Sequence, residues 1–248
     1  MKFDELFNVA KKFDKFGSVV FSLVLAISIA LLVFPGPHGE AILHPCLIVL
    51  AIAAIVCTVV TTIYQTEGNC ALRDSQLSDG LGAGVGEPNR EDYYNNALPK
   101  SMRRLAATTL ENTFFTKEVL SAMATRERIK NAAYFLVLLA LMACRWTSTE
   151  WLLILSQTLF SADLILQWIR LERFRLRTNR VYARLEQFFL QNADINRPND
   201  IAILLAAFTD YECAKDEAVL PLDSEVFEKL NPRLSTEWEE IKKRLGIK

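Results

Sequence analysis

The sequence predicts an all-α membrane protein, built as two transmembrane helical hairpins with helical cytoplasmic extensions. Three observations lead to this prediction. Hydrophobic residues make up 51% of the 248 residues, they are grouped in long blocks, and the basic residues gather between and after those blocks. The formal net charge of -1 hides this uneven distribution, because the stretch from Asp210 to Glu240 is acidic.

Two apolar runs form the predicted first hairpin. Gly17 to Phe34 and Ala41 to Tyr64 contain no Asp, Glu, Lys or Arg, and both have the roughly 17 to 25 residues that a membrane helix needs. Pro35 and Pro37 break the helix between them. The residues before the first run mix acidic and basic side chains, and no small-residue cleavage pattern follows, which favours a permanent anchor over a signal peptide.

The second predicted hairpin is less uniform. Ala132 to Cys144 is only 13 residues long, so it needs local thinning of the bilayer, or flanking side chains that reach the interface, in order to cross. Trp151 to Ile169 is long enough, but its polar content is too high for a helix surrounded by lipid.

The predicted orientation follows from where lysine and arginine lie. There are 4 in Met1 to Phe16, 9 in Gln65 to Lys130 and 14 in Arg170 to Lys248, whereas the two short turns hold only Arg145. Because cytoplasmic segments carry the excess of positive charge, both termini and the middle segment are predicted to be cytoplasmic. The predicted domains are an N-terminal helix with the first hairpin (1–64), a cytoplasmic insert (65–130), the second hairpin (131–170), and an arginine-rich helix with a helical C-terminal region (171–248).

The insert contains a glycine-rich stretch and then a helical pattern. Gly80, Gly82, Gly84 and Gly86 lack the preceding strand and following helix of a phosphate-binding loop, so a flexible surface loop is expected. From Pro99 onward, apolar residues at near-helical intervals predict one helix running into the third span. These residues are Leu105, Leu110, Phe114, Val119 and Met123. We expect Phe114 and Phe115 to pack against a neighbouring helix.

The stretch ERFRLRTNRVYARLEQFF, from Glu172 to Phe189, follows the fourth span and carries five arginines. At about 100° per residue, four of them fall within about 60° of one another, while an apolar stripe lies roughly a quarter turn away. The stripe consists of Phe174, Val181, Leu185 and Phe188. If the helix continues straight, Arg184 lies roughly 20 Å beyond Arg170, outside the reach of the lipid headgroup potential.

The outer arginines therefore need another partner, and two kinds are possible. Glu111, Glu118 and Glu127 of the preceding cytoplasmic helix could form internal ion pairs with them. Alternatively, a line of arginines supplies bidentate contacts to the phosphates of an anionic nucleotide or single-stranded DNA oligomer. On that second reading the nucleotide-binding residues are Arg173, Arg177, Arg180 and Arg184, with Tyr182 as a stacking group.

A polar face also marks the fourth span. Its predicted pore-lining residues fall on one side of the helix, and they are Ser156, Asp163, Gln167 and Arg170. Asp163 is the one acidic residue inside the predicted spans, and burying it near a helix centre costs on the order of 2.5 to 3.5 kcal/mol. It could form a hydrogen-bonded clamp between helices, or a homo-oligomer could gather its copies into a ring that favours cations.

The C-terminal region is predicted to form helices that each have one apolar face, and such faces need another surface to pack against. Asn199 or Asp200 can cap a helix whose apolar face includes Leu204, and Ser235 and Thr236 precede a last helix carrying Trp238. Neither a catalytic arrangement nor a metal or cofactor site can be assembled from the sequence, because both histidines lie in the first hairpin and the five cysteines form no CxxC pair. We expect a protein that is not an enzyme.

The order of hairpin, insert, hairpin and helical tail resembles the four-transmembrane pore-forming effectors of bacterial anti-phage systems, such as the Hailong-type channel subunits. The strings that carry the resemblance are YYNNALPKSMRRLAATTLENTFFTKEVL, NDIAILLAAFTDYECA and LPLDSEVFEKLNPRLSTEWEEIKKRL. The resemblance implies a homo-oligomeric channel of the bacterial inner membrane, paired with a nucleotidyltransferase, that depolarises the infected cell. Its ligand would be a single-stranded DNA oligomer that keeps the channel shut, or a cyclic nucleotide that opens it.

A second hypothesis needs no channel. The chain could be a membrane-anchored scaffold that recruits a cytoplasmic partner through its acidic helical tail, with Asp163 acting only as a structural clamp. Ion flux through the purified protein in liposomes separates the two hypotheses, since a scaffold passes no ions under any ligand condition.

Overall fold

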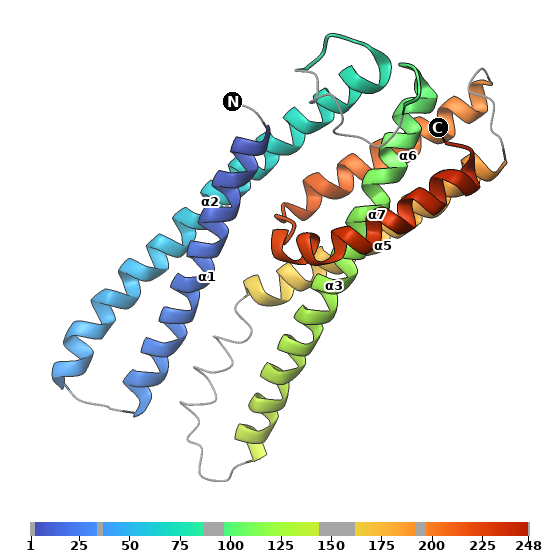
Figure 1. The fold of residues 1–248 in the computed structure, drawn as a ribbon. Helices are drawn as coiled ribbons and strands as arrows, with labels where there is room; N and C mark the ends of the chain where they lie inside the picture. The colour runs from blue at the N-terminus through green and yellow to red at the C-terminus, as the bar shows by residue number, and fades with distance from the viewer. Residues whose placement is uncertain (1–2, 34–36, 87–96, 144–161, 192–196, 248) are drawn as a thin grey trace. The chain divides into compact units, whose positions relative to one another are not determined.

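The computed structural model describes residues 3–33, 37–86, 97–143, 162–191 and 197–247, and its secondary structure in these ranges is entirely helical. The all-α part of the predicted fold class is therefore confirmed. The helices, labelled as in Figure 1, are α1 (Phe3–Val33), α2 (Pro37–Leu81), α3 (Met102–Ala143), α5 (Ala162–Leu190), α6 (Pro198–Ala218) and α7 (Ser224–Leu245).

The chain divides into two compact units. Unit 1 contains Met1–Gly68 and Ile129–Leu166, and unit 2 contains Asn69–Arg128 and Gln167–Lys248. The boundaries between the units fall inside α2, α3 and α5 rather than in loops, so each of these three helices contributes to both units.

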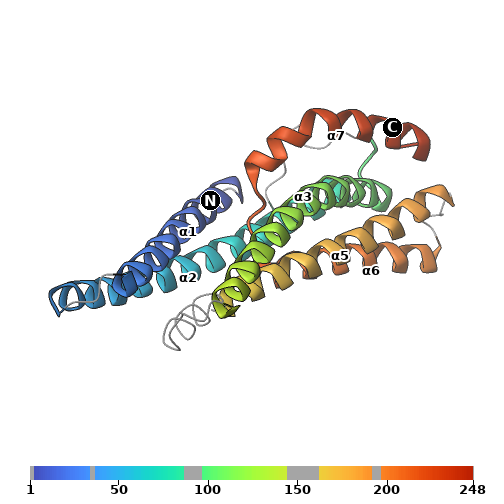
Figure 2. The same cartoon turned by 90° about the horizontal axis from the view of Figure 1, so that it is seen from below.

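Unit 1 includes α1 and the apolar part of α2, which lie side by side in both ribbon views (Figures 1 and 2). Small residues allow a close approach between these helices. A Cβ atom added at Gly17 would lie 3.4 Å from Cys57 Cβ, and one added at Gly68 would lie 2.7 Å from Phe7 Cε1. The two helices therefore pack backbone to side chain at these points, and no bulkier residue fits at Gly68 without movement of the Phe7 ring.

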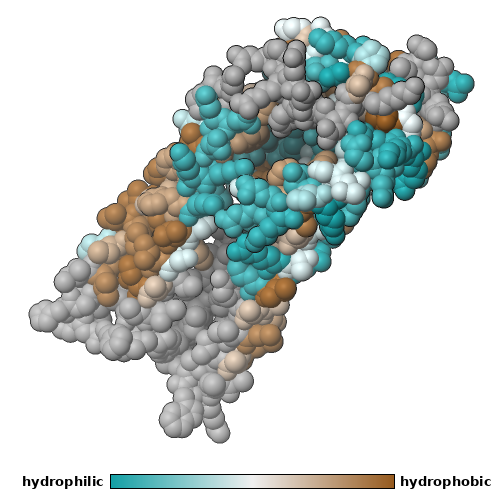
Figure 3. Space-filling model, in the orientation of Figure 1, coloured by the Kyte–Doolittle hydropathy of each residue, from teal (hydrophilic) through white to brown (hydrophobic). Residues whose placement is uncertain are grey.

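The surface of unit 1 is rich in large apolar side chains. Figure 3 shows them gathered over α1 and α2, and Ile48 and Val49 are 63% and 65% exposed. Among the described residues, one stretch of helix, Pro45–Leu81, is long and apolar enough to cross a membrane by length and composition. The fourth predicted span is Trp151 to Ile169. Most of it, and the turn that precedes it, lie outside the described residues.

Unit 2 has a conventional buried core. The predicted apolar stripe of the arginine-rich helix is confirmed, because each of its members is at most 5% exposed; they are Phe174, Val181, Leu185 and Phe188. On α3, Leu105, Leu110, Phe114 and Val119 are buried and Met123 packs partly buried against the same core. Leu204 of α6 and Trp238 of α7 complete it with no exposed surface.

Helix α2 extends beyond the predicted span. The apolar run ends at Tyr64, whereas the helix continues to Leu81 and includes the buried Gly80. A Cβ atom at Gly80 would lie 3.0 Å from Leu105 Cβ, so the absence of a side chain lets α2 approach α3. The expectation of a flexible surface loop at this glycine is therefore wrong.

The glycines that follow fold back along α2. The backbone N–H groups of Val85 and Gly86 donate hydrogen bonds to Ser78 Oγ at 3.2 and 2.7 Å. A Cβ atom at Gly86 would lie 2.8 Å from the carbonyl carbon of Asp74. This close approach of two backbone segments explains why glycine stands at position 86.

The two C-terminal helices begin elsewhere than the sequence suggested. The residue that caps α6 is Arg197, whose side chain makes no capping hydrogen bond, rather than Asn199 or Asp200. Helix α7 begins at Ser224, where the Asp223 carboxylate accepts hydrogen bonds from two backbone N–H groups. Ser235 consequently lies inside α7 instead of preceding it.

Candidate functional site

The candidate site lies along α5. This helix runs without a break from Ala162 to Leu190, so it contains Asp163 near its start and all of the predicted nucleotide-binding residues after it. Gln167 and Arg170 are exposed in its second and third turns. Ser156 and the side chain of Asp163 lie outside the described part of the chain.

Arg177 is held by two carboxylates of α6. Its Nε and Nη2 atoms donate to Asp210 Oδ1 at 3.0 and 2.7 Å, and its Nη1 atom lies 2.7 Å from Glu217 Oε1. The hydrogen bonds to Glu217 and Asp210 raise the pKa of the guanidinium, so the group stays charged at any physiological pH. Its side chain is 22% exposed, which partly shields these contacts from water.

The other three arginines are more open to solvent. Arg173 is 69% exposed and lies 3.3 Å from Glu217 Oε2, so it shares that carboxylate with Arg177. Arg180 is exposed and Arg184 is half-buried, and neither has an ion-pair partner among the described residues. The row therefore divides into two arginines held by α6 and two that remain available.

The internal partners of the row were expected on the preceding cytoplasmic helix. Instead, the carboxylates that pair with Arg173 and Arg177 come from α6, which lies along α5 in Figure 2. Glu118 of α3 lies 3.7 Å from Lys117 and 3.9 Å from Arg233. The sequence could not reveal α6 as the partner, because its acidic residues are spaced like those of any solvated helix.

Tyr182 lies in the core of unit 2 and not on the arginine face. It is 8% exposed, and burial raises the pKa of its hydroxyl to about 12. The hydroxyl donates a hydrogen bond to Glu186 Oε1 at 3.3 Å, and Lys117 Nζ lies 3.7 Å from the ring centroid. Residues two apart on a helix point in nearly opposite directions, so closeness in sequence to Arg180 does not make Tyr182 a surface for base stacking in this structure.

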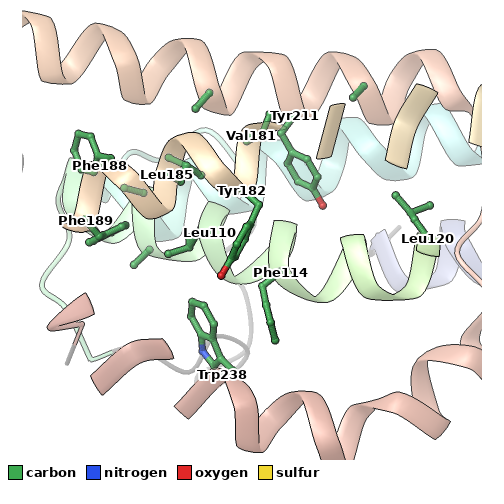
Figure 4. Close-up of a cluster of buried hydrophobic side chains, with 14 of the residues drawn as sticks. Leu110, Phe114, Leu120, Val181, Tyr182, Leu185, Phe188, Phe189, Tyr211 and Trp238 are labelled. Carbon is green, nitrogen blue, oxygen red and sulfur yellow. The ribbon is translucent and has the colours of Figure 1, made fainter. Parts of the chain in front are cut away.

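An aromatic cluster surrounds Tyr182 and joins three helices. The rings of Phe114 and Trp238 are stacked with centroids 5.8 Å apart, and the centroids of Phe114 and Tyr182 are 6.1 Å apart. Figure 4 shows Tyr182 of α5 and Trp238 of α7 pointing toward Phe114 of α3. The expected packing role of Phe114 is confirmed, and the cluster fixes the rotation of α5 about its own axis.

A second polar cluster ties α6 to α2 within unit 2. Asn69 Nδ2 donates to Asp216 Oδ1 at 3.1 Å, and Arg73 Nη1 lies 3.7 Å from Asp216 Oδ2. Glu212 is 4% exposed and lies 2.7 Å from Lys215 Nζ; burial raises the pKa of its carboxyl group. Helix α6 thus pairs Asp210 and Glu217 with α5 and Asp216 with α2. Through these contacts it connects the arginine row of α5 to α2 within unit 2.

Other chemistry is not evident in the described part of the chain. No group of three or more His, Cys, Asp or Glu side chains there could hold a metal ion. Comparisons with protein families, with characterised proteins and with solved structures found no match. No relative therefore assigns a role to these residues, and the arginine row remains the candidate site.

Proposed function

We propose that this protein is a homo-oligomeric ion channel of the bacterial inner membrane, controlled by an anionic nucleotide or single-stranded DNA oligomer. In this role it would depolarise the membrane during anti-phage defence, as the partner of a nucleotidyltransferase. The observation that carries the proposal is the continuity of α5, which joins Asp163 to Arg173, Arg180 and Arg184 in one helix. A ligand on the arginines would then act on the same helix that contains the predicted pore residue.

The exposed surface of unit 1 supports placement in a membrane with two transmembrane hairpins. Large apolar residues cover the outside of α1, α2 and the end of α3. Facing water would cost the protein a free energy of roughly 25 cal/mol per Å² of this apolar surface, compared with burying it. These residues include Val19, Leu23, Ile52, Ile55, Val59, Ile63, Phe135 and Leu136. Lipid tails would cover these side chains without requiring any protein partner.

The ion pairs suggest how a ligand could act. Phosphate groups would meet Arg180 and Arg184 first, because these lack carboxylate partners in the described part of the chain. Contact with Arg173 and Arg177 would require them to leave Glu217 and Asp210. Binding would therefore loosen α6 from α5, and that change would reach the membrane end of α5 along one helix.

Binding of a labelled short single-stranded DNA and of cyclic nucleotides to the detergent-purified protein tests the sensor. We expect affinity that falls with salt, is lost in Arg180→Glu/Arg184→Glu, and is retained in Arg126→Glu, which changes an exposed arginine of α3 away from the row. Equal binding by all three proteins would remove the arginine row from the proposal.

Currents in planar bilayers test the pore. We expect Asp163→Asn to change ion selectivity or conductance, since loss of a ring of carboxylates weakens the attraction for cations. Unchanged currents would remove Asp163 from the conducting path. An absence of ion flux in liposomes under every ligand condition would overturn the channel as a whole.

A membrane-anchored scaffold is the second candidate, and one observation favours it. Asp210 and Glu217 already neutralise Arg173 and Arg177, so half of the arginine row is accounted for without a ligand. In that case the outward faces of α6 and α7 would recruit a cytoplasmic partner. The liposome flux measurement decides between the two candidates.

A further inference from the structure

Helix α6 buries a charged pair on the side that it turns toward α2. Glu212 is 4% exposed, the side chain of Lys215 is 10% exposed, and 2.7 Å separates Glu212 Oε2 from Lys215 Nζ. Both residues belong to α6, so this pair attaches the helix to no other element. Taking two charges out of water opposes their mutual attraction, and the loss of hydration can exceed that attraction.

The second oxygen of the Glu212 carboxyl group is the decisive feature. Oε1 is buried and accepts no hydrogen bond, although an ionised carboxylate has acceptor positions on both oxygens. A charged group that is buried without its hydrogen bonds is strongly disfavoured, whereas the protonated carboxyl group carries no charge. The surroundings of Glu212 therefore favour the form that has bound a proton.

The charged groups around Glu212 do not reverse this preference. Burial is the largest influence and raises the pKa of the Glu212 carboxyl group. Lys215 lowers this pKa, Asp216 raises it, and Arg73 of α2 lowers it. Arg73 also lies 3.7 Å from Asp216 and 3.7 Å from Asp74, so its charge is shared among several carboxylates. The net result is a pKa above the ordinary value of 4.5.

Glu212 lies where α6 is attached to α2 and α3. Asn69 Nδ2 of α2 donates to Asp216 Oδ1 at 3.1 Å, and the hydroxyl groups of Thr116 on α3 and Tyr211 on α6 are 2.9 Å apart. Tyr211 and Asp216 stand on either side of Glu212 in the sequence of α6. A change of charge at Glu212 therefore acts on the contact that holds α6 in unit 2.

We propose that Glu212 is a proton-binding site that strengthens the attachment of α6 to α2 in mildly acidic solution. The folded protein keeps this proton over a pH range in which the unfolded chain has already lost it. The stability that the group contributes is fully present below its ordinary pKa of 4.5, and it is lost as the pH rises through the raised pKa. Above that range a carboxylate is buried as an ion, and the attachment is weakest.

This inference goes beyond the proposed function. From the other side, α5 faces α6 with Arg177, which is bound to Asp210 and Glu217. A proton on Glu212 would thus steady the helix whose carboxylates compete with any anion for the arginine row. The proton-binding site itself requires neither ion conduction nor a nucleotide, so failure of the bilayer or nucleotide measurements would leave it standing.

Melting temperatures in a non-ionic detergent, measured from about pH 8 to about pH 5, test the site. Glu212→Gln imitates the uncharged form. We expect it to melt above the unchanged protein at the higher pH, and we expect the difference to narrow as the pH falls. Glu240→Gln changes an exposed carboxylate of α7 and should melt with the unchanged protein throughout.

Two results of that measurement would overturn the proposal. A lower melting temperature of Glu212→Gln at the higher pH would mean that the ionised pair with Lys215 stabilises the fold. A difference that stays constant across the pH range would mean that Glu212 does not take up a proton there.

Hydrogen exchange of the unchanged chain is a second test, and it needs no substitution. After correction for the intrinsic pH dependence of amide exchange, protection of the α6 amides should rise relative to that of the α7 amides as the pH falls over the same range. Equal changes in both helices, or a loss of protection in α6, would contradict the proposal even if Glu212→Gln did not fold.

Discussion

The two units treat the same residue types in opposite ways. In unit 1 the large apolar side chains lie outside, as Ile52 and Ile55 do on α2, whereas in unit 2 Leu110, Leu204 and Trp238 are fully buried. Unit 2 also pairs its charged side chains across helices, as Arg177 does with Asp210. Among the described residues, unit 2 therefore has a buried apolar core tied by ion pairs, while unit 1 leaves many of its large apolar side chains exposed.

Trp238→Ala should produce the largest effect, because it removes a fully buried ring stacked on Phe114. We expect a loss of about 3 to 5 kcal/mol in the stability of unit 2, seen as a large fall in the melting temperature in detergent. Val49→Ala in unit 1 removes an exposed side chain and should change stability by no more than about 0.5 kcal/mol. Similar losses for both variants would erase the contrast between the units.

Replacing an exposed isoleucine with arginine should affect membrane insertion differently in the two units. Ile52→Arg puts an arginine in the middle of the apolar part of α2 and should oppose membrane insertion by about 2.5 to 3.5 kcal/mol. Ile203→Arg on α6 should insert normally, although Ile203 is also exposed. The fraction of each protein that resists carbonate extraction from membranes measures this, and equal extraction would mean that lipid does not cover α2.

Double-mutant cycles should rank the ion pairs that hold α6 to α5. The partly shielded Arg177–Asp210 pair should show a coupling energy of about 1.5 to 3 kcal/mol in chemical unfolding. The Arg173–Glu217 pair, with both side chains more than half exposed, should show about 0 to 1 kcal/mol. A larger coupling for the exposed pair would contradict the picture of α6 as a helix clamped mainly through Arg177.

Alanine substitutions at two glycines of unit 2 should give the smallest difference in stability, and the most local one. Gly86→Ala forces a Cβ atom to within 2.8 Å of the Asp74 backbone and should cost about 1 to 3 kcal/mol as the segment shifts. Gly84→Ala meets nothing within 4 Å, so its melting temperature should match that of the unchanged protein. Equal melting temperatures for the two variants would show that the fold-back onto α2 contributes little.

Periodicity predicted the buried face of α5 and the long α3 well, because a stripe such as Phe174, Val181 and Leu185 has one stable solution, which is burial against another helix. Hydropathy marked the apolar run that ends at Tyr64, but it carries no information on where the helix itself ends. Helix α2 continues to Leu81, since polar residues sustain a helix as readily as apolar ones.

The candidate site shows a similar division between local and long-range information. Local spacing predicted that four arginines share a face, but the partners Asp210 and Glu217 lie on a helix whose packing depends on the whole core. The start of α7 was missed because Asp223 caps it while Pro232 stands inside it, and a proline within a helical pattern suggests an interruption.

The aromatic cluster also has a consequence in time. Phe114 emerges from the ribosome about 70 residues before Tyr182 and about 120 residues before Trp238. At a synthesis rate of 5 to 20 residues per second, the later partner arrives roughly 6 to 25 s after Phe114. The apolar face of α3 therefore lacks its last aromatic partner for that interval in every new chain.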